Sequence, residues 1–352
     1  MSRTRPFARA GLLVATCLMA ACGEGKPDAA AYVPVVEPLT GTVLYGGDRL
    51  SRPQSIGVAG DWVLVGDVPR PHALHVIARA DGRYLASWGR QGEGPGEFSS
   101  LWGIQSAGPR EVWLFDPAQV RLTLLDVSAL LAGAPNPLRR TLVLRGDHLP
   151  MTAVWTADSL LVSSGMFTTG RLARFDAAGE PRDVVGPLPP AKPNTPPAVA
   201  QHAYAGTLVR HPSRPLLAIG TRHADRVEIY GTDGRLVTVG RGPANFEPVY
   251  EPKVRAGAPV MGTGDDLRFG YVDLFATDDR LYALYSGATR AERPGKASFG
   301  VEVHAFDWDG RLRARYALDA LALAIAVDPG GSTLYAVRHD PEPAVLRYPL
   351  LR

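Results

Sequence analysis

Residues 272–287 read VDLFATDDRLYALYSG, and residues 301–319 read VEVHAFDWDGRLRARYALD. Short runs of β-branched, aromatic and leucine residues alternate here with turn residues, a pattern that predicts four short strands joined by turns. Asp309-Gly310 supplies the positive φ angles that a tight hairpin needs. The stretch therefore predicts a unit of four antiparallel strands.

The same unit recurs along the whole chain. Its second strand is the most apolar part, and the copies begin about 50 residues apart. The six apolar runs are Trp62–Val65, Val112–Phe115, Leu160–Val162, Leu216–Ile219, Leu281–Tyr285 and Leu334–Val337. A repeat of this length built from four strands predicts a β-propeller. Continuous apolar runs fit sheets that are buried on both faces, as stacked blades are. In the second unit, an insertion at Ser128–Pro137 replaces the last tight turn.

The last unit lacks a fourth strand. It ends with AVLRYPL at 344–350, whereas TGTVLY at 40–45 precedes the first unit and has no partner of its own. We expect residues 40–45 to close the ring as the outer strand of the last blade, which removes an exposed sheet edge. The predicted fold is an all-β, six-bladed β-propeller of four-stranded antiparallel blades over residues 36–352.

The composition agrees with a folded, loop-rich β protein. Apolar residues make up 45% of the 352 residues, enough for a core, and Gly 38 and Pro 31 disfavour long helices. Two cysteines are too few for a disulfide scaffold or a cysteine-rich zinc protein.

The N-terminal segment is typical of a targeting signal. Arg3, Arg5 and Arg9 precede an apolar run at 11–21 that is too short to span a bilayer. We interpret residues 1–21 as a secretory signal peptide. The sequence LMAAC that ends at Cys22 resembles the bacterial lipoprotein signal, which implies a lipid anchor on Cys22. Residues 22–35 are expected to form a flexible tether.

Processing removes three arginines and no acid, so the formal net charge falls from +3 to zero. The main support for nucleic-acid binding disappears with them. The expected location is the bacterial cell envelope, with the chain anchored to a membrane as a periplasmic or outer-membrane lipoprotein.

Two blade junctions carry a family resemblance. Residues 89–98 read GRQGEGPGEF and resemble the junction of NHL-repeat propellers, with Leu101 in the usual place of proline; residues 240–246 read GRGPANF, a degraded copy. The C-terminal third, from 270 to 350, resembles the TolB-like six-bladed propeller lipoproteins. The resemblance implies the propeller fold and envelope location but names no activity.

Candidate binding residues come from the expected geometry of a propeller, whose first strands line a central channel. Tyr271 and Asp273 alternate on a first strand and should share one side. His202 and Arg210 flank another first strand. The alternative interpretation, which is the simpler one, is that these residues pack and hydrogen-bond the inner ring.

At the first junction, Arg90 and Glu97 could face a ligand or could form structural ion pairs. The glycines there do not fit a phosphate loop, because a strand rather than a helix follows them.

No motif for catalysis stands out. HExxH, CxxC and GxSxG are absent, and the acidic pairs at 265–266 and 278–279 are interpreted as solvated turns in preference to calcium ligands. We expect no metal and no cofactor, and a binding or scaffolding module for a protein, glycan or small molecule. The alternative is a lactonase-like hydrolase or a lyase with a channel metal. Its Glu, Asn and Asp ligands have little support here, since Asn136, Asn194 and Asn245 lie on no clear first strand.

Overall fold

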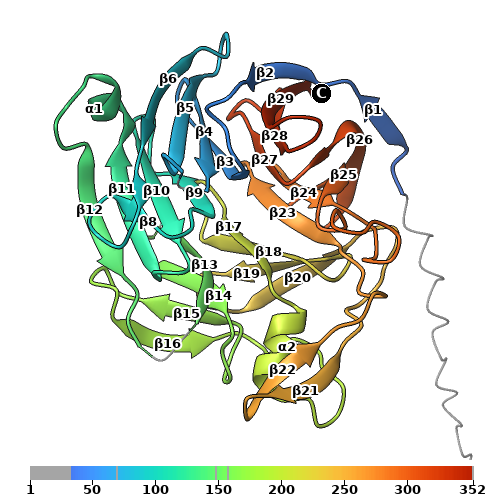
Figure 1. The fold of residues 1–352 in the computed structure, drawn as a ribbon. Coiled ribbons are helices and arrows are strands. Elements are labelled where there is room, and N and C mark those ends of the chain that lie inside the picture. The colour runs from blue at the N-terminus through green and yellow to red at the C-terminus, as the bar shows by residue number, and fades with distance from the viewer. Residues whose placement is uncertain (1–32, 69, 147–148, 157, 351–352) are drawn as a thin grey trace, which may run out of the picture. The chain divides into compact units, whose positions relative to one another are not determined.

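Six sheets form a ring in the part of the chain that the computed structural model describes (Figure 1); each has four antiparallel strands, and one carries a fifth, parallel strand. The described residues are 33–350 without 69, 147–148 and 157. The predicted signal peptide, Cys22 and most of the predicted tether therefore lie outside the described residues. Residues 34–352 cluster as one compact unit.

Each blade takes its strands in chain order from the centre of the ring outwards. Blade 1 consists of β3 (Pro53–Ala59), β4 (Trp62–Asp67), β5 (Leu74–Ala78) and β6 (Tyr84–Trp88). Blade 2 consists of β9 (Gly103–Ser106), β10 (Glu111–Asp116), β11 (Arg121–Asp126) and β12 (Leu138–Val143). Blade 3 consists of β13 (Pro150–Trp155), β14 (Leu161–Gly165), β15 (Leu172–Phe175) and β16 (Pro181–Val185).

The second half of the chain repeats this order. Blade 4 consists of β17 (Gly206–Arg210), β18 (Leu216–Thr221), β19 (Arg226–Gly231) and β20 (Leu236–Arg241). Blade 5 consists of β23 (Tyr271–Ala276), β24 (Leu281–Tyr285), β25 (Gly300–Phe306) and β26 (Leu312–Ala322). Blade 6 consists of β27 (Ala324–Val327), β28 (Thr333–Arg338), β29 (Ala344–Pro349) and the N-terminal strand β2 (Thr42–Gly46).

The N-terminal segment closes the ring, as the sequence predicted. β2 pairs antiparallel with β29, with Thr42 opposite Arg347 and Gly46 opposite Ala344. One strand was not anticipated: β1 (Val36–Leu39) adds to the outer edge of blade 5, parallel to β26. The N-terminal segment therefore joins two neighbouring blades.

Stacked blades supply the hydrophobic core. Among the described residues, six buried clusters each combine side chains from two neighbouring blades. Between blades 6 and 1, for example, Leu44 of the closing strand packs with Val63, Val65 and Val337. Each blade thus buries both faces, which explains the continuous apolar runs in the sequence.

Tight glycine turns end the third strands as expected. Gly82 has φ +78°, and a Cβ there would lie 1.8 Å from the Leu44 carbonyl oxygen. Glycine is required at this turn both by the backbone conformation and by its contact with the closing strand.

Four short additions decorate the ring. The insertion in blade 2 contains the one-turn helix α1 (Val127–Leu131), and β7 (Arg90–Gln91) pairs with β8 (Glu97–Phe98) at the first junction. Helix α2 (Pro197–Ala203) precedes blade 4, and the hairpin of β21 (Glu251–Arg255) and β22 (Ala258–Gly262) follows it. In Figure 1 the helix and the hairpin lie together at the bottom, where Tyr204, Tyr250 and Met261 pack with α2.

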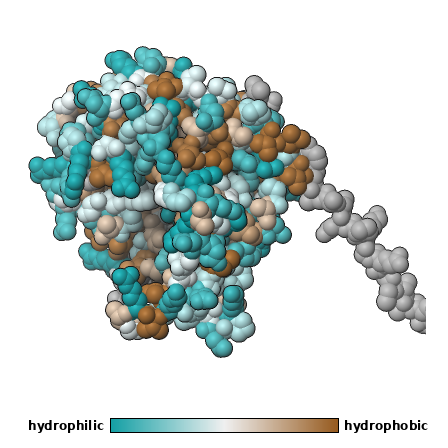
Figure 2. All heavy atoms as spheres, turned by 45° about the vertical axis from the view of Figure 1, so that its right-hand side comes forward, coloured by the Kyte–Doolittle hydropathy of each residue, from teal (hydrophilic) through white to brown (hydrophobic). Residues whose placement is uncertain are grey.

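The surface is of mixed character. Figure 2 shows a largely hydrophilic flank interrupted by hydrophobic patches. Exposed large hydrophobic residues include Val35, Val43 and Val254. In the described part of the chain, no helix combines the length and apolarity that a bilayer crossing requires.

Candidate functional site

A central cavity of about 1240 Å³ runs between the first strands of the blades. Residues of β3, β9, β13, β17, β23 and β27 all line it, as expected for the inner ring of a propeller. Its wall is largely apolar, with Ile56, Val58, Ile104, Val272 and Ile325 among the lining side chains. A cavity of this kind, with a few converging polar groups, is the usual form of a ligand site.

Two arginines and two histidines lie at one end of the cavity. First strands begin and second strands end there, so the β18–β19 turn, the end of α2 and the β24–β25 connection meet at this opening. These segments contribute Arg222, His223, His202 and Arg290 to the lining. We refer to these four residues as the basic mouth.

The β18–β19 turn is fixed on both sides. The Arg222 amide donates to the Ala205 carbonyl at 2.9 Å, and the Gly270 amide donates to the Arg222 carbonyl at 2.7 Å. Further along the turn, buried Asp225 accepts hydrogen bonds from the Ala244 and Asn245 amides. The backbone that carries Arg222 and His223 is thus held in place by neighbouring segments before any ligand arrives.

Burial and neighbouring cations keep the two histidines neutral at pH 7. Desolvation, followed by the charge of Arg222, lowers the pKa of His223 to about 3, and His202 and Arg290 contribute in the same direction. The same two causes lower the pKa of His202. The positive charge of the basic mouth therefore comes from Arg222 and Arg290, while the imidazoles offer neutral donors and acceptors.

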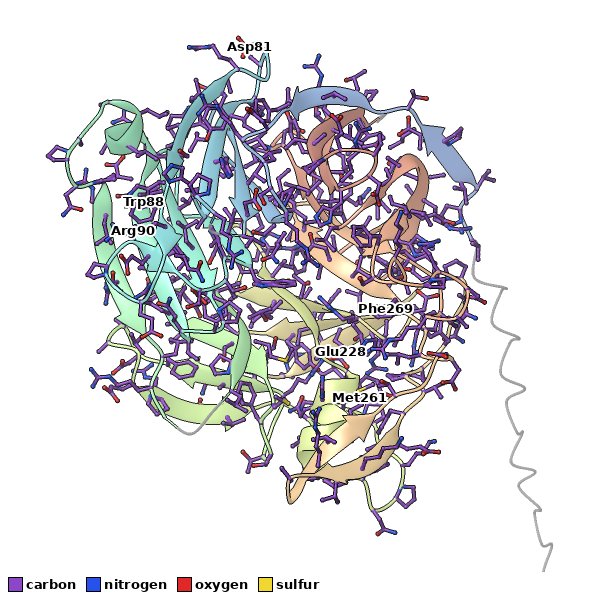
Figure 3. All side chains as sticks on the ribbon, in the orientation of Figure 1. Asp81, Trp88, Arg90, Glu228, Met261 and Phe269 are labelled. Atoms are coloured by element: carbon purple, nitrogen blue, oxygen red, sulfur yellow. The ribbon has the colours of Figure 1, made fainter. Side chains whose placement is uncertain are left out.

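A buried ionic network fixes the helix that carries His202. Arg171, only 1% exposed, donates to Glu228 at 2.9 Å, to the Gln201 side chain at 2.9 Å and to the Tyr204 carbonyl at 2.8 Å. Glu228 also accepts from Arg226 at 2.8 Å. Gln201 lies on α2, so this network ties the helix to blades 3 and 4; Figure 3 labels Glu228 within it.

A half-buried acid, Asp273, lies in the cavity wall near the same end. The Asp273 carboxylate accepts a 2.9 Å hydrogen bond from the Ile325 amide. Desolvation raises the pKa of Asp273 to about 6, although the Ile325 bond and the charge of Arg222 oppose the shift. Asp273 is therefore ionised at pH 7 at a cost to the folded state.

Asp273→Asn is expected to stabilise the protein at pH 7.5, because it keeps an oxygen to accept from Ile325 and removes a poorly solvated charge. The folded pKa lies above the unfolded value, so ionisation destabilises the fold fully above about pH 6 and not at all below about pH 4. The gain should be on the order of 1–3 kcal/mol at pH 7.5 and should vanish near pH 4.

Thermal melts at the two pH values measure this effect. Asp61→Asn is the matched control, since its side chain is 96% exposed and should shift neither melt. An equal gain for Asp273→Asn at both pH values would contradict the assignment of the effect to ionisation.

Three of the residues singled out from the sequence line the cavity. His202 belongs to the basic mouth, Asp273 lies toward it, and Arg210 lies at the opposite end. The Arg210 guanidinium donates to the carbonyl oxygens of Ser106 at 3.3 Å and Pro212 at 2.6 Å. Arg210 therefore links blades 4 and 2 at the ends of their first strands.

Tyr271 does not share a side with Asp273. The pairing of β23 with β24 shifts register between the two residues, which breaks the alternation assumed from the sequence. Tyr271 is fully buried between blades 4 and 5, and its hydroxyl contacts Asp225 at 2.6 Å and His304 at 2.9 Å.

Arg90 and Glu97 form an ion pair at 2.7 Å and do not line the cavity. Glu97 also accepts from the Gly94 amide at 2.9 Å, which holds the glycine-rich junction in shape. In Figure 3, Arg90 lies on the outer side of the ring, well away from the cavity residue Phe269.

The described residues do not present a metal site. No group of three or more His, Cys, Asp or Glu side chains in the described ranges is placed to hold a metal ion. The carboxylates that line the cavity there are Asp273 and Asp278, with no asparagine beside them. This donor set does not fit the calcium ligands of a lactonase-like propeller.

Sequence reasoning missed most of the basic mouth. Arg222 and His223 follow directly after the second strand of blade 4, a position that always falls at one end of a propeller. This position in the sequence could have been used to predict that both residues lie at the opening of the cavity. Arg290 lies in a long connection whose course no local pattern predicts.

A ring of four-stranded blades around a lined central cavity defines a six-bladed β-propeller. Residues 37–329 match the sequence family described as TolB-like 6-blade propeller-like, and the chain belongs to this family. No curated protein matches the chain in sequence.

Solved structures agree on the fold. The structure of U3-55K has a TM-score of 0.52 and 11% identity, covering 92% of this chain and 100% of that chain. The RRP9 WD40 repeats give 0.51 and 11%, with coverage of 91% and 100%. A Bacteroides fragilis protein described as exported gives 0.52 and 10%, with coverage of 90% and 95%. At these identities the likeness shows the fold alone.

Proposed function

We propose that this protein is a binding module of the bacterial cell envelope, anchored through a lipid on Cys22, and that its central cavity receives the ligand. The observation that carries the proposal is the 1240 Å³ cavity whose apolar wall ends in the basic mouth. The LMAAC sequence before Gly23 and the structural likeness to an exported protein support the location.

The proposal favours binding over catalysis. The cavity lining offers carboxylates, imidazoles and guanidinium groups. Asp278 of the lining accepts a hydrogen bond from the Ser213 hydroxyl at 2.7 Å, but among the described residues no histidine accepts from a serine hydroxyl. A protein or glycan partner would meet the same opening from outside, where Trp102 (43% exposed) and Leu149 (57% exposed) lie. These exposed apolar side chains at the rim fit a contact surface.

The test is whether protein that has been extracted from its own membrane carries a bound molecule. Native mass spectra of full-length protein, released in mild detergent, should show an additional mass that Gln54→Trp removes. Gln54 lines the cavity and is partly buried, so an indole there fills space without cutting a hydrogen bond among the described groups. Gln91→Trp is the matched control, because Gln91 is exposed on β7, outside the cavity.

A further inference from the structure

Arg222 is a charged side chain without a direct partner in the cavity wall. Its guanidinium makes no hydrogen bond or ion pair with any described residue. Burial lowers the pKa of Arg222, and Asp273 acts on it electrostatically from beyond ion-pair distance. Arg210, at the other end of the cavity, differs because its guanidinium donates to the Pro212 and Ser106 carbonyl oxygens.

His223, beside Arg222, is also incompletely paired. The side chain is 8% exposed and lines the cavity, with its ring edge-to-face against Phe269 at 5.1 Å. Its Nδ1 atom is buried and has no hydrogen-bond partner among the described groups. Buried polar atoms are rarely left unpaired, since each one costs free energy.

Arg290 adds a second cation to this opening. It donates to the Thr263 hydroxyl at 3.1 Å through one nitrogen, which leaves other N–H donors of its guanidinium available. Thr263 is the partner of Arg290 among the described residues, and no carboxylate neutralises the charge there. Arg222 and Arg290 thus supply two positive charges that the protein itself does not balance by contact.

The surroundings of these groups are apolar. Phe269, Val272 and Phe299 line the cavity beside the basic mouth, and Ile325 continues the wall inwards. A ligand that satisfies both parts of this surface needs an oxyanion and a hydrocarbon body.

We propose that the basic mouth binds the carboxylate or phosphate of an organic anion, with the apolar body of that molecule against the cavity wall. Arg222 contributes the charge-assisted hydrogen bonds, and His223 and His202 contribute neutral N–H donors. This inference rests on the proposed function and names the class of ligand for the same cavity.

The experiment compares octanoate with octan-1-ol, which share a hydrocarbon chain and differ in charge. Binding to the wild-type protein is measured by isothermal titration at pH 7.5, with inorganic phosphate as a third probe. Octanoate should bind at least ten-fold more tightly than octan-1-ol and more tightly than phosphate. Arg222→Gln should weaken octanoate about ten-fold or more and leave octan-1-ol unchanged, and Arg222→Lys should restore part of the loss.

Arg145→Gln is the matched control, since Arg145 pairs with Glu180 on the surface and lies outside the cavity. A second readout is the His223 ring resonance in NMR spectra, which should shift with octanoate and not with octan-1-ol. Equal binding of octanoate and octan-1-ol, equal octanoate binding by wild type and Arg222→Gln, or no octanoate binding would overturn the inference.

Phosphate binding as tight as octanoate would overturn the apolar part of the proposal and indicate a site for a free oxyanion. The proposed function can still hold in each of these cases. The proposed function is contradicted by a separate experiment, native mass spectrometry, if protein from native membranes carries no bound molecule.

Discussion

A chain that lacks residues 36–46 is expected to lose its cooperative thermal unfolding transition. This segment contributes β2 to blade 6 and β1 to blade 5, and it buries Leu39 and Leu44 in two clusters between blades. Its removal opens β29 as an unpaired edge and exposes the adjoining hydrophobic side chains. Because blades are stable only through their neighbours, the loss should spread around the ring.

Circular dichroism melts measure this loss, and a chain that begins at residue 33 serves as the control. The control keeps both strands and should melt like the mature protein. A deletion variant that melts cooperatively at the temperature of the control would show that the ring does not depend on its N-terminal closure.

Glu228→Gln is expected to destabilise the fold by about 3–5 kcal/mol. The substitution leaves the cations Arg171 and Arg226 without their shared carboxylate. Both side chains are buried, with exposed fractions of 1% and 9%. Replacing Glu228 also loosens α2, since Arg171 links Glu228 to Gln201 and Tyr204. Urea unfolding at pH 7.5 measures the change in the free energy of unfolding.

The pH dependence separates the charge from simple packing. Burial alone would raise the pKa of Glu228, but Arg171 and Arg226 outweigh it and hold that pKa below its ordinary value. The carboxylate therefore stabilises the fold above about pH 4.5, and this contribution is lost as the pH falls through the lowered folded pKa. The difference in the free energy of unfolding between wild type and Glu228→Gln should therefore become smaller at acidic pH.

Glu180→Gln is the matched control for this pair of experiments. Glu180 forms a surface ion pair with Arg145 and has a 48% exposed side chain, so its removal should cost less than about 1 kcal/mol. If Glu228→Gln cost no more than Glu180→Gln, the network would not be a structural link between blades 3 and 4.

The sequence was sufficient to predict the fold because each blade carries its own strand and turn signals. The apolar runs fall on the second strands, such as β10 and β24, and the Asp-Gly pairs fall on hairpin turns. Ring closure was predictable by elimination, since residues 40–45 had no local partner and blade 6 lacked a strand.

The candidate site was predicted less well, since it depends on how distant segments meet. His202 and Asp273 were found because they lie beside or on first strands. Arg222 and Arg290 were missed because loops from blades 4 and 5 bring them together. Tyr271 was misplaced because a register shift in β23 breaks the alternation that a regular strand would have.

The proposed function requires that the cavity hold a molecule in the native envelope. Native mass spectra of the protein from its own membranes measure whether such a molecule is bound. We predict an additional bound mass in the wild type and in Gln91→Trp that is absent from Gln54→Trp. An equal bound mass in all three proteins, or none in any of them, would contradict the proposed function.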